Sequence, residues 1–131
     1  MSAQPAVSFR DESGWRIGVI GRDAMAEPDV LADIQDAVHR SLEERPARRL
    51  ALDLAAVQYI ASNGMSLLLM LHKRQREAGG ELTLCGLDAN VARSFHVARL
   101  DRVFEIHESS ATLQRDRPDG TPAAAAPKAT G

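Results

Sequence analysis

A chain of 131 residues has the length of one ordinary domain, and its composition, 44% hydrophobic and 26% charged, is that of a soluble globular protein. The formal net charge of −2 provides no basic field for a nucleic-acid backbone and little attraction to anionic lipid. With a single cysteine, Cys85, no intrachain disulfide can form. The N-terminal sequence has no export signal and no apolar run reaches membrane-spanning length, so we expect a cytoplasmic protein without membrane insertion.

The start of the chain predicts a β-hairpin. Strands are expected at residues 6–10 and 15–20, and large apolar residues recur at every second position of the second strand, as in a half-buried strand. The turn-forming residues 11–14 favour antiparallel pairing of the two strands. Residues 21–25 are expected to be a connection.

From Pro28 the apolar period becomes that of a helix. Apolar residues recur at spacings of three and four as far as Leu42, with polar residues between them, and Pro46 ends the pattern. Residues 50–54 form a short apolar run whose length and position after a helix favour a buried strand. Residues 55–61 are expected to connect this strand to the next helix.

A second helix is expected to start at Ser-Asn-Gly, residues 62–64. Ser and Asn side chains can accept hydrogen bonds from the unpaired N–H groups of a first helical turn. The helix should continue over residues 65–78 and stop at the glycine pair 79–80. Its first half is apolar enough to pack on more than one side, whereas residues 72–77 are expected to be solvated.

The remaining elements continue the alternation of strands and helices. A strand is expected at residues 82–85, and Cys85 within it should be buried and inert because no His or acid lies beside it. Asp88 can cap a third helix, residues 103–106 predict a last strand, and residues 109–114 predict a final short helix.

The order of these elements predicts an α/β fold. It consists of a mixed, largely parallel four- to five-stranded sheet with flanking helices and an N-terminal hairpin. We expect the domain to span residues 1–116. Residues 117–131 carry no large apolar side chain and are expected to form a disordered tail.

Little in the sequence indicates catalysis, a cofactor or a metal. There is no Gly-rich phosphate loop and no nucleophile elbow. Asp53 ends a strand, as a receiver-type phospho-acceptor would, but the acidic cluster that should hold Mg²⁺ is absent after Ile20. The four histidines are scattered, without metal-ligand spacing: His39, His72, His96 and His107.

The start of the second helix is the most distinctive position on physical grounds. Backbone N–H groups and the helix dipole make this end electropositive, so a phosphate placed there would be stabilised and would change what a partner encounters. The alternative is that Ser62 and Asn63 only cap the helix.

Residues 50–65, LALDLAAVQYIASNGM, resemble the central motif of STAS domains. In anti-sigma factor antagonists of that family the motif reads roughly D-L-S-x-V-x-x-I/M-D-S-S/T-G-L. Residues 79–84 and 91–106 resemble the second half of the family, so the resemblance covers about residues 7–114. It implies a sheet flanked by helices and a role in partner switching. In that scheme the unphosphorylated antagonist binds an anti-sigma kinase, and phosphorylation of the second hydroxyl residue of the motif silences it.

This sequence departs from the motif at the decisive positions. The family's Asp falls on Ala61, its first Ser on Ser62 and its phospho-acceptor on Asn63, which has neither a hydroxyl nor a charge. Asn63 is therefore not expected to be phosphorylated, and Ser62 is the alternative acceptor. If Asn63 caps the helix, Asn63→Asp should leave the fold intact or slightly more stable.

The resemblance implies a protein partner, an anti-sigma factor or serine kinase-like protein, and is compatible with a weak homodimer. The partner-binding residues would be Ser62, Asn63, Gly64, Met65 and Ser66. Two other classes of function stay open: an accessory subunit of a membrane transporter or a component of a signalling assembly. An enzyme with Ser62 as nucleophile is disfavoured because no general base is evident.

Overall fold

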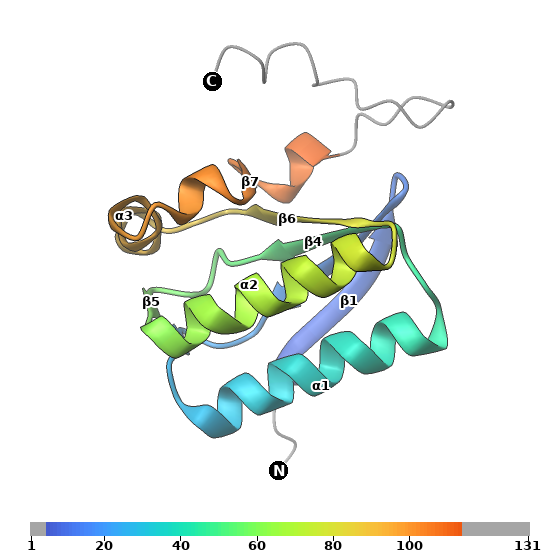
Figure 1. The fold of residues 1–131 in the computed structure, drawn as a ribbon, viewed down its shortest axis with the longest axis horizontal. Coiled ribbons are helices and arrows are strands. Elements are labelled where there is room, and N and C mark those ends of the chain that lie inside the picture. The colour runs from blue at the N-terminus through green and yellow to red at the C-terminus, as the bar shows by residue number, and fades with distance from the viewer. Residues whose placement is uncertain (1–4, 114–131) are drawn as a thin grey trace.

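A computed structural model describes residues 5–113, and its fold is a sheet with two long helices on one face (Figure 1). The main sheet has the strand order β1-β2-β4-β6-β7; β1 is antiparallel to β2, and every other neighbouring pair is parallel. This confirms the predicted mixed, largely parallel sheet. In chain order the elements are β1 (Val7–Glu12), β2 (Trp15–Ile20), β3 (Ala24–Met25), α1 (Pro28–Glu44), β4 (Arg49–Asp53), β5 (Tyr59–Ile60), α2 (Ser62–Glu77), β6 (Glu81–Cys85), α3 (Ala89–Val97), η1 (Leu100–Arg102), β7 (Glu105–His107) and η2 (Ser110–Leu113).

The N-terminal hairpin is confirmed, with a tighter turn than predicted. β1 extends to Glu12, which pairs with Trp15, so the loop consists of Ser13 and Gly14 alone. Both loop residues have positive φ, 55° and 87°. Two-residue hairpin loops favour this backbone because its twist matches that of the strands.

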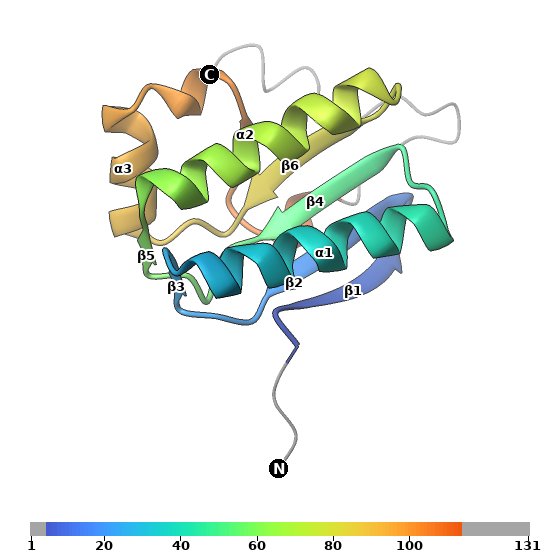
Figure 2. The same cartoon turned by 60° about the horizontal axis from the view of Figure 1, so that its bottom comes forward.

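The expected connections at residues 21–25 and 55–61 are only partly irregular. β3 and β5 lie within them and pair in parallel, Ala24 with Tyr59 and Met25 with Ile60. Strands of two residues carry no readable period, so the sequence did not reveal this second sheet. It joins the segment before α1 to the segment before α2, and both helices begin beside it (Figure 2).

The main core lies between the sheet and the two long helices. Ile34 and Val38 of α1 and Leu68 of α2 are fully buried against Leu52 and Leu84 of the central strands. A second, smaller cluster consists of Trp15, Ile17, Ala51, Cys85 and Leu113. Within residues 5–113 no helix combines the length and apolar character needed to cross a membrane.

The second half of α2 is not uniformly solvated, contrary to the expectation from the sequence. Gln75 is only 5% exposed, because it follows Leu71 by one helical turn on the inward face. His72 is half-buried, and its ring lies 5.1 Å from that of Phe104, centre to centre. The helix ends as predicted: Gly79 has a φ of 87°, and the Gly80 N–H donates to the carbonyl of Gln75.

The elements after α2 follow the predicted order with small shifts. The Asp88 carboxylate accepts a hydrogen bond from the Asn90 N–H at 2.9 Å and so caps α3, as predicted. Cys85 is fully buried, and burial raises the pKa of its thiol to about 12. The last strand starts two residues and ends one residue later than expected, and the final helix is a short 3₁₀ turn. Gln114, the domain boundary at 116 and the tail 117–131 lie outside the described residues.

A buried arginine ties the hairpin to the end of α1. Arg16, 5% exposed, donates to the Asp11 carboxylate at 2.8 Å and to the main-chain carbonyls of Ser41 at 3.0 Å and Arg45 at 2.6 Å. These carbonyls belong to the last turn of the helix, where a cation is favoured. The hydrogen bond from Arg16 lowers the pKa of Asp11 below its ordinary value of 3.8.

The lowered pKa of Asp11 predicts a pH-dependent contribution to stability. A carboxyl whose pKa is lower in the folded state stabilises the fold above its unfolded pKa, and this contribution is lost as the pH falls through the folded pKa. Asp11→Asn should therefore lower the melting temperature at neutral pH, and its difference from the parent should shrink as the pH falls below the ordinary aspartate pKa of 3.8. Thermal unfolding measured from about pH 2 to pH 7, with the exposed Glu44→Gln as control, tests this. A constant difference across that range would contradict it.

Candidate functional site

The start of α2 lies at the edge of the sheet where the parallel strands end. β4 ends at Asp53, and the chain then passes through β5 and turns back into α2 (Figure 1). In α/β sheets this carboxyl-terminal edge is where binding sites gather. The predicted site residues 62–66 form the first turn of α2 at this edge.

Gly64 allows α2 to lie directly on the small β3–β5 sheet. It is buried, and a Cβ atom at this position would overlap the carbonyl oxygen of Met25 and lie 2.9 Å from Cγ1 of Ile60. The Ala61 N–H donates to the same Met25 carbonyl at 3.1 Å. The glycine of the motif is therefore needed for close approach of the backbone, not for a positive φ.

Ser62 and Asn63 do not cap α2, which corrects the expectation from the sequence. The N-cap residue is Ala61, with extended φ and ψ of −96° and 174°, and no side chain donates or accepts a capping hydrogen bond there. Ser62 and Asn63 are thus the first and second helical residues. A capping side chain must belong to the residue before the first helical position, and alanine has no acceptor to offer.

The Asn63 amide acts as a donor instead. Its Nδ2 atom donates to the main-chain carbonyl of Ala26 at 2.7 Å, across 37 positions of sequence. Ala26 precedes Glu27, the N-cap residue of α1. This hydrogen bond holds the starts of the two helices together, and the Asn63 side chain remains exposed on the surface.

The rest of the predicted site divides into exposed and half-buried side chains. Ser62 and Ser66 are exposed, whereas Met65 is half-buried against the main core. Sequence reasoning missed Tyr59, which lies in β5 just before the helix and is 59% exposed. Tyr59 is paired with Ala24 of β3, and nothing in the local sequence signals that pairing.

The edge around the site carries negative charge. The main-chain carbonyl of Asp23 accepts hydrogen bonds from the N–H groups of Gln58 and Tyr59, at 2.7 and 3.2 Å, so Asp23 is adjacent to β5. The side chains of Asp23 and Glu27 are both exposed. A partner that covers Asn63 therefore meets polar groups, one aromatic ring and acidic neighbours.

Among the described residues, no side-chain hydrogen bond joins Ser62 to a histidine or a carboxylate. His96 is paired with Asp101 at 2.9 Å, His107 lies 3.3 Å from the hydroxyl of Thr112, and His72 packs on Phe104. The Asp53 carboxylate accepts from the Ala55 N–H at 2.9 Å, which is a turn contact and not the geometry of a phospho-acceptor beside an acidic cluster.

Comparison with known proteins identifies the family. Residues 30–113 match the model of the STAS domain, so this chain belongs to the STAS domain family, as the central motif predicted. A Bordetella bronchiseptica protein named "Putative anti-sigma factor antagonist BtrV" is 33% identical over 66 residues, which cover 50% of this chain and 57% of that protein. The chain thus spans just over half the length of this curated relative.

Solved structures share the fold. The anti-sigma-factor antagonist (STAS) domain protein of Planctomyces limnophilus superposes with a TM-score of 0.71 at 17% identity, over 83% of this chain and 94% of that one. An anti-sigma factor antagonist of Mycobacterium paratuberculosis gives a TM-score of 0.68 at 17% identity, over 85% and 93% of the two chains. At this level of identity the likeness concerns the fold.

Proposed function

We propose that this chain is a cytoplasmic, non-enzymatic regulatory module that binds an anti-sigma factor or a serine kinase-like protein through the start of α2. In this proposal the binding surface is centred on residues 62–66, with Tyr59 beside it. The observation that carries the proposal is Asn63, an exposed amide at the second position of α2, where the family motif places its phosphorylated hydroxyl.

The chemistry of Asn63 is the argument that the module stays in its binding-competent, unphosphorylated state. The amide has no hydroxyl to accept a phosphoryl group, and its hydrogen bond to Ala26 keeps the starts of α1 and α2 in one arrangement. A phosphate here would add about −1.5 to −2 charges at pH 7. Because Asp23 and Glu27 already make this edge acidic, such a charge would change the surface strongly. We infer that regulation by phosphorylation at this position has been lost.

Asn63→Asp and Asn63→Ser together isolate the effect of a charge at the site. Asp has no donor and the Ser hydroxyl is one bond shorter than the Asn amide nitrogen, so both variants weaken the donation to Ala26, but only Asp adds a negative group. The Asp variant should therefore bind the partner at least ~1 kcal/mol more weakly than the Ser variant, because the carboxylate must be desolvated in the interface. Titration calorimetry against the anti-sigma factor recovered from the native host measures this difference.

Asn90→Asp is a matched control for this experiment. Asn90 is also exposed and also occupies the second position of a helix, α3. The same change of amide to carboxylate at Asn90 should leave partner affinity unchanged. Equal affinity of the Asn63→Asp and Asn63→Ser variants would place the binding surface elsewhere and would remove the basis of the proposal.

A further inference from the structure

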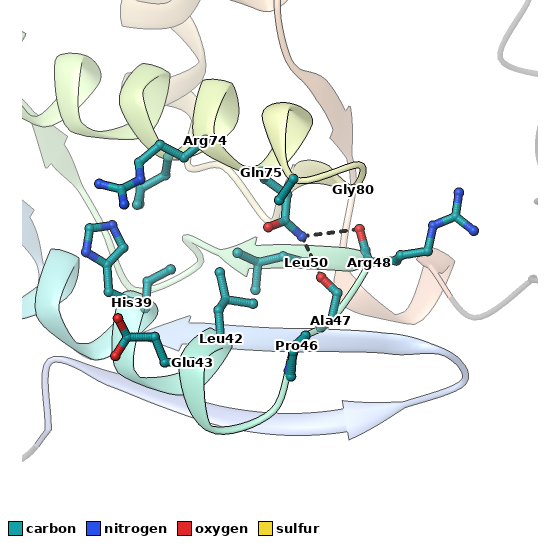
Figure 3. Close-up of a pocket in the computed structure, with 13 residues that line it drawn as sticks. His39, Leu42, Glu43, Pro46, Ala47, Arg48, Leu50, Arg74, Gln75 and Gly80 are labelled. Atoms are coloured by element: carbon teal, nitrogen blue, oxygen red, sulfur yellow. Dashed lines mark hydrogen bonds between the residues drawn. The ribbon is translucent and has the colours of Figure 1, made fainter.

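A groove of about 480 Å³ opens between the C-terminal halves of α1 and α2, at the end of the helices away from the candidate site (Figure 3). The loop between α1 and β4 and the turn after α2 close one end of it. The groove therefore shares helix α2 with the candidate site but none of its residues. Its side-chain lining comes chiefly from His39, Leu42 and Glu43 of α1, Pro46 of the loop, and Arg74 and Gln75 of α2.

The closed end of the groove is held by hydrogen bonds. The buried Gln75 amide donates to the main-chain carbonyls of Ala47 at 2.7 Å and Arg48 at 3.2 Å. Gly80 fits beneath this contact, since a Cβ atom there would lie 2.8 Å from the Gln75 Nε2 atom. Because both walls are tied together in this way, the groove is formed before any ligand enters it.

The body of the groove is apolar. Val38, Leu50 and Leu71 belong to the buried core and form its floor. Leu42 is half-buried and Pro46 is exposed, so these two side chains offer the groove apolar surface that is accessible to a ligand. A ligand with a hydrocarbon part would remove this surface from water.

The open end of the groove carries the positive charge of Arg74. Arg74 and His39 reach this end from opposite walls (Figure 3). Within residues 5–113 Arg74 has no carboxylate partner, and the Nε2 atom of His39 is buried without a hydrogen bond. The side chain of Arg48 leads away from the groove. Glu43 is the one acidic side chain among the lining residues.

We propose that this groove binds a small amphipathic carboxylate, with its hydrocarbon chain along Leu42 and Pro46 and its carboxylate on Arg74. Arg74 belongs to the last turn of α2, where the helix dipole is negative, so its guanidinium is the positive group in the groove with which an anionic group can pair. Arginine matches the planar geometry of a carboxylate. The apolar side chains of Leu42 and Pro46 bind the hydrocarbon chain and the Arg74 guanidinium binds the carboxylate, so together they define both the ligand class and its orientation. This inference goes beyond the proposed function and does not depend on it.

Titration of the full chain with octanoate, followed by backbone amide NMR, tests the proposal. Saturable shifts should be confined to amides near Leu42, Arg74 and Ala78, while residues 62–66 should stay unchanged. Acetate lacks the chain and 1-octanol lacks the charge, so each should bind at least tenfold more weakly than octanoate. The proposal is overturned if no saturable shift occurs below the micelle-forming concentration, or if either control compound binds as tightly.

Substitutions separate the role of Arg74 from that of general surface charge. Arg74→Gln should weaken octanoate binding about tenfold, the value of one charge-assisted hydrogen-bonded pair. Arg76→Gln, two residues later on the exposed surface of the same helix, is the matched control and should bind like the parent. Glu43→Gln removes the competing carboxylate and should tighten binding roughly twofold. Equal losses at Arg74 and Arg76 would reduce the effect to net charge and would refute the assigned orientation.

Discussion

Leu68→Ala is expected to lower the free energy of unfolding by about 2–5 kcal/mol. Leu68 is fully buried on the inner face of α2, within the core between the helices and the sheet. The truncation removes apolar contacts and leaves a cavity that the sheet, with its parallel strands in fixed register, cannot readily fill. Urea denaturation of parent and variant measures the change.

Lys73→Ala is the control for this experiment. Lys73 is exposed on the same helix, so its replacement should change the free energy of unfolding by no more than about 0.5 kcal/mol. A similarly small change for Leu68→Ala would mean that α2 is not anchored on the core through this residue, and the packing described for the helix would be wrong.

Gly64→Ala is expected to destabilise the protein by roughly 1–3 kcal/mol, the usual cost of overpacking. In an unconstrained helix the same change would stabilise by about 1 kcal/mol. Here the new methyl group would overlap the Met25 carbonyl oxygen, which is main chain and cannot rotate away. Relief requires α2 to move off β3, which should also break the hydrogen bond from Asn63 to Ala26.

Thermal unfolding measures the loss of stability in Gly64→Ala, and amide NMR measures the loss of the hydrogen bond from Asn63 to Ala26. Ser66→Ala changes an exposed position of the same turn and should be neutral or slightly stabilising. If Gly64→Ala were as stable as Ser66→Ala and left the Asn63 amide resonances in place, the close approach of α2 to β3 would not govern the geometry of this site.

Much of the fold could be predicted because most helices and strands show a recognisable spacing of apolar residues in their own sequence. The spacing of apolar residues defines α1, the short apolar runs define β4 and β6, and Gly79 marks the end of α2. The β3–β5 pair was missed because two-residue strands are specified by tertiary contact alone. Gln75 was assigned to solvent because a polar side chain in a charged segment does not reveal that it will meet free carbonyls.

The helix start that carries the candidate site was predictable from the sequence, but its contacts were not. The motif located residues 62–66, and the structure places them at the first turn of a helix. The role of Asn63 was inverted, from capping acceptor to donor, because its partner Ala26 is 37 positions away in the sequence. Tyr59 was not singled out, since the pairing of its strand with β3 has no local signal.

The burial of Cys85 gives the molecule an internal reporter of its own opening. The thiol lies in β6 between two neighbouring strands, is fully buried, and is the only thiol in the chain. An alkylating reagent reacts with the thiolate, so labelling requires opening of the cluster of Trp15, Ile17, Ala51 and Leu113 that buries Cys85. The rate of alkylation in the native protein therefore reports how often this cluster opens. Any molecule that binds only the folded chain should slow that reaction in proportion to its occupancy, without a tag or an engineered probe.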